Sequence, residues 1–194
     1  VNFFVCFSVI VFIGLVVYGL LIINSPKHVF YLMPQSLAFV FLARAVPNLR
    51  LSYPPLHDPY YHYVCSLNLL KYGMLKPILN WWYPQINMQL HWPNMHLINA
   101  VLVKVSNINE MQFFRFQEPL MGIILFLAVF ILAKCITKNN AISMLAALFA
   151  SLGDTIIFYQ SEYHPQGLAF VYFTFLFYFY IKSRVQRNIF FTSL

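Results

Sequence analysis

Long apolar runs alternate with short polar connections along this chain, and five runs stand out. They cover about residues 1–23, 29–47, 117–137, 140–160 and 166–181. A helix needs roughly 20 mainly apolar residues to cross a bilayer; the first four runs reach that length, and the fifth is short but continuous. The first run is too long for a signal peptide and has neither a basic start nor a small-residue cleavage site. The pattern predicts an all-α protein, a polytopic transmembrane bundle of about five spans.

The segment 48–116 is the one long connection, and it is not a flexible linker. Residues 59–73 and 94–106 carry apolar side chains at helical spacing, for example Val64, Leu67 and Leu70 in the first. This spacing predicts two helices that lie along the membrane surface. Gly73 is placed to end the first of them as a C-terminal cap. We interpret residues 1–194 as a single transmembrane domain with a long external loop.

The composition agrees with a membrane protein. Hydrophobic residues make up 61% of the 194 residues and charged residues 9%, and the mean hydropathy is +0.69. A soluble domain of this length needs more polar surface. The net charge of +7 comes from Lys and Arg scattered singly between apolar runs, so no basic stripe indicates a nucleic-acid partner. The three cysteines have no metal-type spacing. The chain begins with Val1, and we expect it to be a piece of a longer protein.

Basic residues in the short connections predict the orientation. Because cytoplasmic connections are enriched in Lys and Arg, the connections with basic residues and no acidic ones are assigned to the cytoplasm. Their basic residues are Lys27, Lys134, Lys138, Lys182, Arg184 and Arg187. Segments 48–116 and 161–166 then face the external side, together with nearly all of the acidic residues.

Asp58 is the first candidate functional residue, in the sequence His57-Asp58-Pro59-Tyr60-Tyr61-His62-Tyr63. Asp at an N-cap followed by Pro is an ordinary helix start, and this reading needs no function. A carboxylate at a helix start is also held rigidly and stays ionised beside the positive end of the helix dipole. His62 lies four residues later, on the same helical face, where it could bond Asp58 or share a metal with it. We expect His91 and His96 to be surface residues.

A second acidic position emerges at the same membrane face. Glu162, His164 and Gln166 lie in a connection so short that they must stay near the helix ends. Asp154 precedes them by two turns within an apolar run. An ionisable group in a span is either functional or a neutral, hydrogen-bonded Asp packed between helices, and both readings stay open.

These motifs resemble the GT-C superfamily of polytopic glycosyltransferases, and most closely archaeal oligosaccharyltransferase catalytic subunits and dolichyl-phosphate-mannose-protein mannosyltransferases. The resemblance covers roughly residues 29 to 181. It rests on "FLARAVPNLR" followed by "HDPYYHYVCSLNLLKYGML", then "WWYPQ", and then two spans and an acidic short loop. The family's second acidic motif corresponds to Glu162-Tyr163-His164, where His164 replaces the usual second carboxylate. The catalytic subunit's C-terminal acceptor-recognition motif is not present.

The resemblance implies sugar transfer from a polyprenyl-phosphate-linked donor to a protein or glycan acceptor at the external face. It assigns catalytic roles to Asp58 and Glu162. Donor-phosphate binding is expected from Arg50, Arg115 and Lys71, and substrate contacts from His57, Tyr61, His62, Trp81 and Trp82. Lipid-headgroup contact is the alternative for the basic residues, and an interfacial aromatic belt for the tryptophans.

A divalent cation, Mn²⁺ or Mg²⁺, held by Asp58, Glu162 and His164, is an open requirement, because many relatives that use lipid monophosphates need no metal. The expected location is a prokaryotic, archaeal plasma membrane. Two other functions remain: a transporter in which Asp154 and Glu162 line a solute path, and a non-catalytic scaffold. The mostly apolar spans disfavour the transporter.

Overall fold

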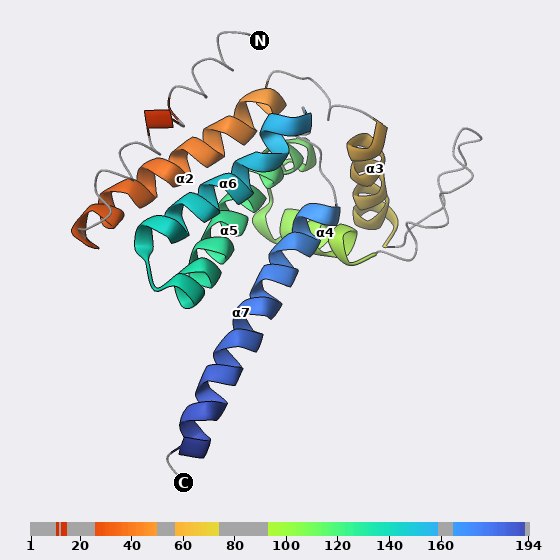
Figure 1. Cartoon of the computed structure of the whole chain (residues 1–194). Helices are drawn as coiled ribbons and strands as arrows, with labels where there is room; N and C mark the ends of the chain where they lie inside the picture. The colour runs from red at the N-terminus through yellow and green to blue at the C-terminus, as the bar shows by residue number, and fades with distance from the viewer. Residues whose placement is uncertain are drawn as a thin grey trace. The chain divides into compact units, whose positions relative to one another are not determined.

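A computed structural model of the chain describes residues 11, 13–14, 26–49, 57–73, 93–158 and 165–192. At several helix positions the description covers the backbone alone; these are 26–30, 47–49, 57–61, 93, 95, 118, 154–158, 165–167 and 185–192. The described residues form helices and contain no strand (Figure 1). The helices are α2 (Pro26–Leu49), α3 (His57–Tyr72), α4 (Pro93–Ser106), α5 (Glu110–Thr137), α6 (Asn140–Phe158) and α7 (Pro165–Thr192).

The predicted helices agree with these elements, with two differences in length. The helix α5 begins at Glu110 rather than at residue 117, because Asn109 caps it: the Asn109 Oδ1 accepts hydrogen bonds from the amides of Met111 and Gln112. The helix α7 continues past residue 181 to Thr192. The predicted span 1–23 lies outside the described residues except for Val11, Ile13 and Gly14.

One helix of the described part is long and apolar enough to cross a membrane, and it is α5. The apolar stretches Tyr31–Val46 of α2 and Asn140–Gly153 of α6 are shorter than the roughly 20 residues that a crossing requires. The described helices therefore contain one candidate membrane span, and the expected five spans are not established by them. The all-helical class is confirmed.

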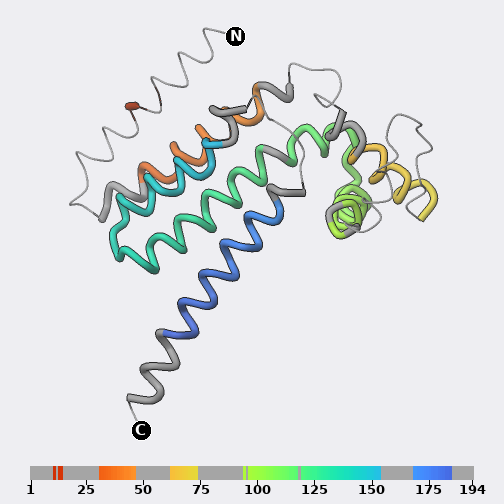
Figure 2. Tube along the Cα trace, turned by 45° about the vertical axis from the view of Figure 1, so that its right-hand side comes forward, coloured from red at the N-terminus to blue at the C-terminus, as the bar shows by residue number. Residues whose placement is uncertain are grey.

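The chain divides into two compact units. The first consists of Val1–Arg44, Pro119–Gln160 and Ala169–Leu194, and the second of Ala45–Glu118 and Ser161–Leu168. The core of the first unit is an apolar cluster shared by α2, α5 and α6, which run side by side (Figure 2). Its buried members are Leu32, Phe39, Val40, Ala43, Phe126, Met144, Ala147, Leu148 and Leu152.

A buried arginine joins α2, α5 and α6 of the first unit. Arg44 of α2 is 7% exposed, and its Nε and Nη2 donate hydrogen bonds to the carbonyl oxygen of Ser151 on α6, at 3.0 and 2.7 Å. Its side chain passes over Gly122 of α5, where a Cβ atom would lie only 2.4 Å from Arg44 Cδ. Glycine at position 122 thus makes room for the arginine.

The turn between α5 and α6 is stabilised by its own residues. The Asn139 Oδ1 accepts hydrogen bonds from the amides of Ala141 and Ile142, and so caps α6. At the other helix, the Thr137 hydroxyl donates to the carbonyl of Ala133. Lys138 between them has a φ of 56°. The two helices form a tight αα-hairpin.

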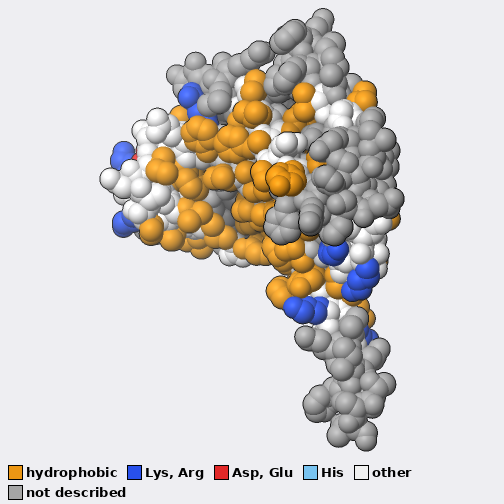
Figure 3. All heavy atoms as spheres, turned by 90° about the vertical axis from the view of Figure 1, so that its left-hand side faces the viewer, with side chains coloured by type: hydrophobic (Ala, Val, Ile, Leu, Met, Phe, Trp, Pro, Cys, Tyr) orange, Lys and Arg blue, Asp and Glu red, His pale blue; other side chains and the backbone are white. Residues whose placement is uncertain are grey.

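Hydrophobic side chains cover much of the described surface on the face that Figure 3 shows, and Lys and Arg lie at its edges. Large exposed apolar residues include Leu42, Ile131, Phe149 and Phe173. An apolar surface of this extent marks a protein that contacts lipid or other proteins.

Candidate functional site

The His57–Tyr63 motif forms the first turns of α3. The helix ends at Tyr72, and Gly73 follows with a φ of +69°. The Gly73 amide donates a 2.9 Å hydrogen bond to the carbonyl of Leu69. Glycine adopts this left-handed conformation without the steric cost that a side chain adds. The predicted C-terminal cap at Gly73 is confirmed.

Several predicted site residues cannot be placed by their side chains. For His57, Asp58, Tyr61 and Asp154 the description covers the helix backbone alone. Arg50, Trp81, Trp82, Glu162 and His164 lie outside the described residues. The predicted convergence of Asp58 and Glu162 therefore stays a prediction. Three of the predicted site residues have described side chains: His62, Lys71 and Arg115.

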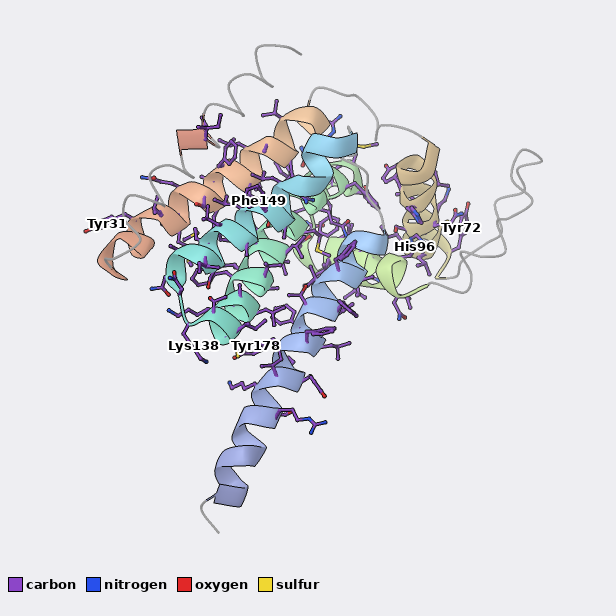
Figure 4. The ribbon with its side chains drawn as sticks, viewed as in Figure 1. Tyr31, Tyr72, His96, Lys138, Phe149 and Tyr178 are labelled. Carbon is purple, nitrogen blue, oxygen red and sulfur yellow. The ribbon has the colours of Figure 1, made fainter. Side chains whose placement is uncertain are left out.

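His62 belongs to a buried polar cluster between α3 and α4, which we call the histidine cluster and define as His62, Ser66 and His96. His62 Nδ1 lies 3.5 Å from His96 Nε2, and Ser66 Oγ lies 3.3 Å from His96 Nδ1. The Ser66 hydroxyl also donates to the carbonyl of His62 at 3.2 Å. His96 is 1% exposed and lies on the side of α4 that faces α3 (Figure 4). The expectation that His96 is a surface residue is therefore wrong.

One assignment of protons satisfies all three contacts of the histidine cluster. Because the single hydroxyl proton of Ser66 is donated to the His62 carbonyl, His96 Nδ1–H must be the donor to Ser66 Oγ. His96 Nε2 is then an acceptor, and His62 Nδ1–H donates to it. This arrangement requires a neutral His96. Consistently, burial lowers the pKa of His96 to about 4.

Burial raises, rather than lowers, the pKa of a thiol beside the histidine cluster. Cys65 precedes Ser66 on α3 and is buried, and desolvation raises its pKa to about 11. The thiolate is the reactive form of cysteine. Burial therefore favours the neutral thiol form of Cys65.

A second polar pair continues the buried face of α4. Gln117 Nε2 of α5 donates a 2.7 Å hydrogen bond to the Oδ1 of Asn99, which lies one turn after His96. Both side chains are buried, and their remaining amide atoms, Asn99 Nδ2 and Gln117 Oε1, have no hydrogen-bond partner in the described part of the chain. Sequence reasoning missed these residues. The available signal was the spacing of the polar residues: His96 and Asn99 are three positions apart and His62 and Ser66 are four, and each spacing places the pair on one face of its helix.

Phe114 of α5 contacts residues from the first turns of α3 and α7. The ring of Tyr63 from α3 meets the Phe114 ring edge-on, with the two ring centroids 4.8 Å apart. Phe113 of α5 and Leu168 of α7 also pack against Phe114. Tyr63 follows Asp58 by five positions, and Leu168 follows Glu162 by six. The helix that contains Asp58 and the helix that follows Glu162 thus both contact the buried side chain of Phe114.

The two described basic candidates differ in burial. Lys71 is exposed, and its Nζ lies 5.2 Å from the centroid of the Tyr72 ring. Arg115 directly follows Phe114 on α5 and is half-buried. A partly desolvated guanidinium binds an anion more strongly than an exposed ammonium does. Of the two, Arg115 is the stronger candidate for the predicted phosphate contact, which stays a prediction.

Among the residues whose side chains are described, no group of three or more His, Cys, Asp and Glu side chains could hold a metal ion. The predicted metal ligands Asp58, Glu162 and His164 are not among those residues.

Comparison with known proteins identified no relative: no protein-family profile, no characterised protein and no solved structure matched the sequence.

Proposed function

We propose that this chain is the N-terminal part of a polytopic membrane glycosyltransferase of the GT-C type. In this proposal the enzyme transfers a sugar from a polyprenyl-phosphate-linked donor to a protein or glycan acceptor at the external face of the membrane. The proposal rests on the resemblance of the two acidic motifs and their order among the apolar helices. The candidate membrane span α5 is consistent with a membrane enzyme.

The packing around Phe114 is the observation that carries the proposal. A glycosyltransfer site needs Asp58 and Glu162 near one another, although about a hundred residues separate them in sequence. Tyr63 and Leu168, which lie close behind them in the chain, pack on the same phenylalanine. Five or six residues limit how far each acidic residue can lie from that point. Arg115, the proposed phosphate ligand, adjoins the same phenylalanine.

The reaction assigned to this site is a nucleophilic substitution at the anomeric carbon of the donor sugar. The acceptor nucleophile forms a bond to C1 and gives its proton to the Asp58 carboxylate. The bond from C1 to the phosphate oxygen breaks, and the lipid phosphate leaves with the electron pair. Arg115, together with Arg50 and Lys71, stabilises the negative charge on the departing phosphate. Glu162 orients the acceptor.

A divalent cation fits the combined donor set of the two acidic motifs only in part. Two carboxylates and one imidazole suit Mn²⁺ better than Mg²⁺, which prefers oxygen ligands. Asp58, Glu162 and His164 would hold the ion, and its chemistry would be charge stabilisation on the leaving phosphate. The basic residues can supply the same stabilisation, so the metal is a secondary part of the proposal. An archaeal plasma membrane is the proposed location.

Sugar transfer in membranes that contain the complete gene product tests the proposal. Radiolabelled polyprenyl-phosphate sugars serve as donors, and the variants are Asp58→Asn and Glu162→Gln. Asp58→Asn keeps the size of the side chain and much of its capping ability. We expect transfer to fall by a factor of about 10² or more in Asp58→Asn, as is typical when a general base is lost. We expect it to fall in Glu162→Gln as well, because the acceptor is then less well oriented.

Glu110→Gln is the matched control. It makes the same chemical change at an acidic residue in the first turn of α5 that belongs to neither motif, and we expect it to retain transfer. Undiminished transfer in Asp58→Asn would leave Asp58 as a helix cap. If no variant and no wild-type membrane transfers sugar, solute uptake that depends on Asp154 is the next function to measure. Repeating the transfer assay with a chelator tests separately whether the reaction requires a metal ion.

A further inference from the structure

The surface helix α4 carries its apolar residues on the outside. Val101 is 58% exposed and Val105 80% exposed. They belong to a continuous stripe at helical spacing, which we call the apolar face of α4. It consists of Leu97, Ile98, Val101, Leu102 and Val105. In a helix of 3.6 residues per turn these positions occupy one side.

The opposite side of α4 carries polar residues, and these are buried. His96 and Asn99 are exposed by 1% and 0%, and both contact other helices of their unit, through Ser66 and Gln117. Val103 completes this buried side. The polarity is therefore the reverse of that of a helix packed on a water-soluble domain, whose apolar stripe faces the core. The exposed aliphatic side must be covered by something other than water.

The connection to α5 restricts what can cover it. The helix α4 has 14 residues, which at about 1.5 Å per residue is about 21 Å and too short for the roughly 30 Å hydrocarbon core. Three residues, 107–109, separate its end from α5, the candidate membrane span. The end of α4 is thus tethered within a few residues of the candidate membrane span.

We propose that the apolar face of α4 lies in the acyl-chain region of the membrane interface. Protein interfaces concentrate Trp, Tyr and Arg at their centres, whereas this face is made of Leu, Ile and Val alone. Lys104, exposed beside it, extends to the headgroups as basic residues of interfacial helices do. The helix therefore binds lipid with one side and holds α3 through the histidine cluster with the other. This inference does not depend on the proposed sugar transfer.

Spin labelling of the complete gene product in liposomes tests the location. The three native cysteines are replaced by alanine, and single cysteines are introduced as Val101→Cys, Val105→Cys and Ser106→Cys. Collision rates are measured with oxygen, which concentrates in the hydrocarbon, and with a water-soluble nickel chelate. All three positions are exposed, so the labels fit without repacking. Ser106→Cys is the matched control, because position 106 adjoins 105 but points about 100° away around the helix.

We expect oxygen to relax the labels at 101 and 105 several-fold more than nickel does, and the label at 106 to show the reverse preference. A water-accessible label at 105 would overturn the proposal. Labels at 101 and 105 that neither reagent reaches would also overturn it, because a protein partner would then cover the face.

Discussion

Gly122→Ala tests the packing of the first unit, because the new methyl group would collide with Arg44. The added Cβ would lie 2.4 Å from Arg44 Cδ and 2.6 Å from Nε, whereas ordinary contacts begin near 3.4 Å. The arginine would have to move from the Ser151 carbonyl, to which it donates two hydrogen bonds. Losing a hydrogen bond to a charged group costs about 1.5–3 kcal/mol, and overpacking costs about 1–3 kcal/mol. Replacing glycine by alanine inside a helix stabilises the helix by about 1 kcal/mol. The net expectation is a loss of about 1.5–5 kcal/mol.

The measurement is the unfolding midpoint of the purified protein in detergent, with Gly153→Ala as the matched control. Gly153 lies within α6, and in the described part of the chain nothing lies within 4 Å of a Cβ atom there. We expect this second variant to be as stable as wild type or more stable, by up to about 1 kcal/mol. A double variant with Arg44→Ala isolates the collision, since Gly122→Ala should cost nothing once the arginine is gone. Equal effects of the two glycine substitutions, or a full cost of Gly122→Ala in the Arg44→Ala background, would refute the reasoning.

Two further predictions concern α3 and α4. His96 has a folded pKa of about 4, below its ordinary value of 6.5, so between these values the unfolded chain binds a proton that the folded chain does not. The free energy of unfolding should therefore fall as the pH falls from about 6.5 to about 4, by at most about 3 kcal/mol. The His96→Asn variant should show a smaller pH dependence of unfolding across this range. Identical pH profiles for the two proteins would contradict the assignment of the lowered pKa to His96. Gly73→Ala should destabilise the protein by about 1–2 kcal/mol because of the φ of +69°. Gly73→Asn should destabilise it by less, since Asn tolerates this conformation. A higher unfolding temperature for the Ala variant than for the Asn variant would contradict this prediction.

The helices were predictable because their apolar residues recur over long stretches. The runs 29–47 and 140–160 lie almost wholly within α2 and α6, and the surface-helix segments 59–73 and 94–106 correspond to α3 and α4. Their ends depend on single side chains, which periodicity does not detect. Asn109 starts α5 seven residues before the apolar run does, because its side chain caps polar residues as readily as apolar ones.

The candidate site was predictable only in part. The motif around Asp58 and its terminating Gly73 are local features, and the sequence places them on one helix. The partner of His62 is not local: His96 comes from a different helix. A single histidine in an apolar sequence does not reveal which way it faces. The buried contact between α3 and α4 is indicated only when two polar pairs are considered together: His62 and Ser66 on α3, and His96 and Asn99 on α4, each about one helical turn apart.

The hairpin of α5 and α6 has a consequence for the synthesis of the protein. Asn139 and Thr137 satisfy the backbone at the turn from within the hairpin, and Phe126 and Leu148 belong to one apolar cluster. The pair therefore needs no distant segment to complete its turn, and it can form as soon as both helices have left the ribosome.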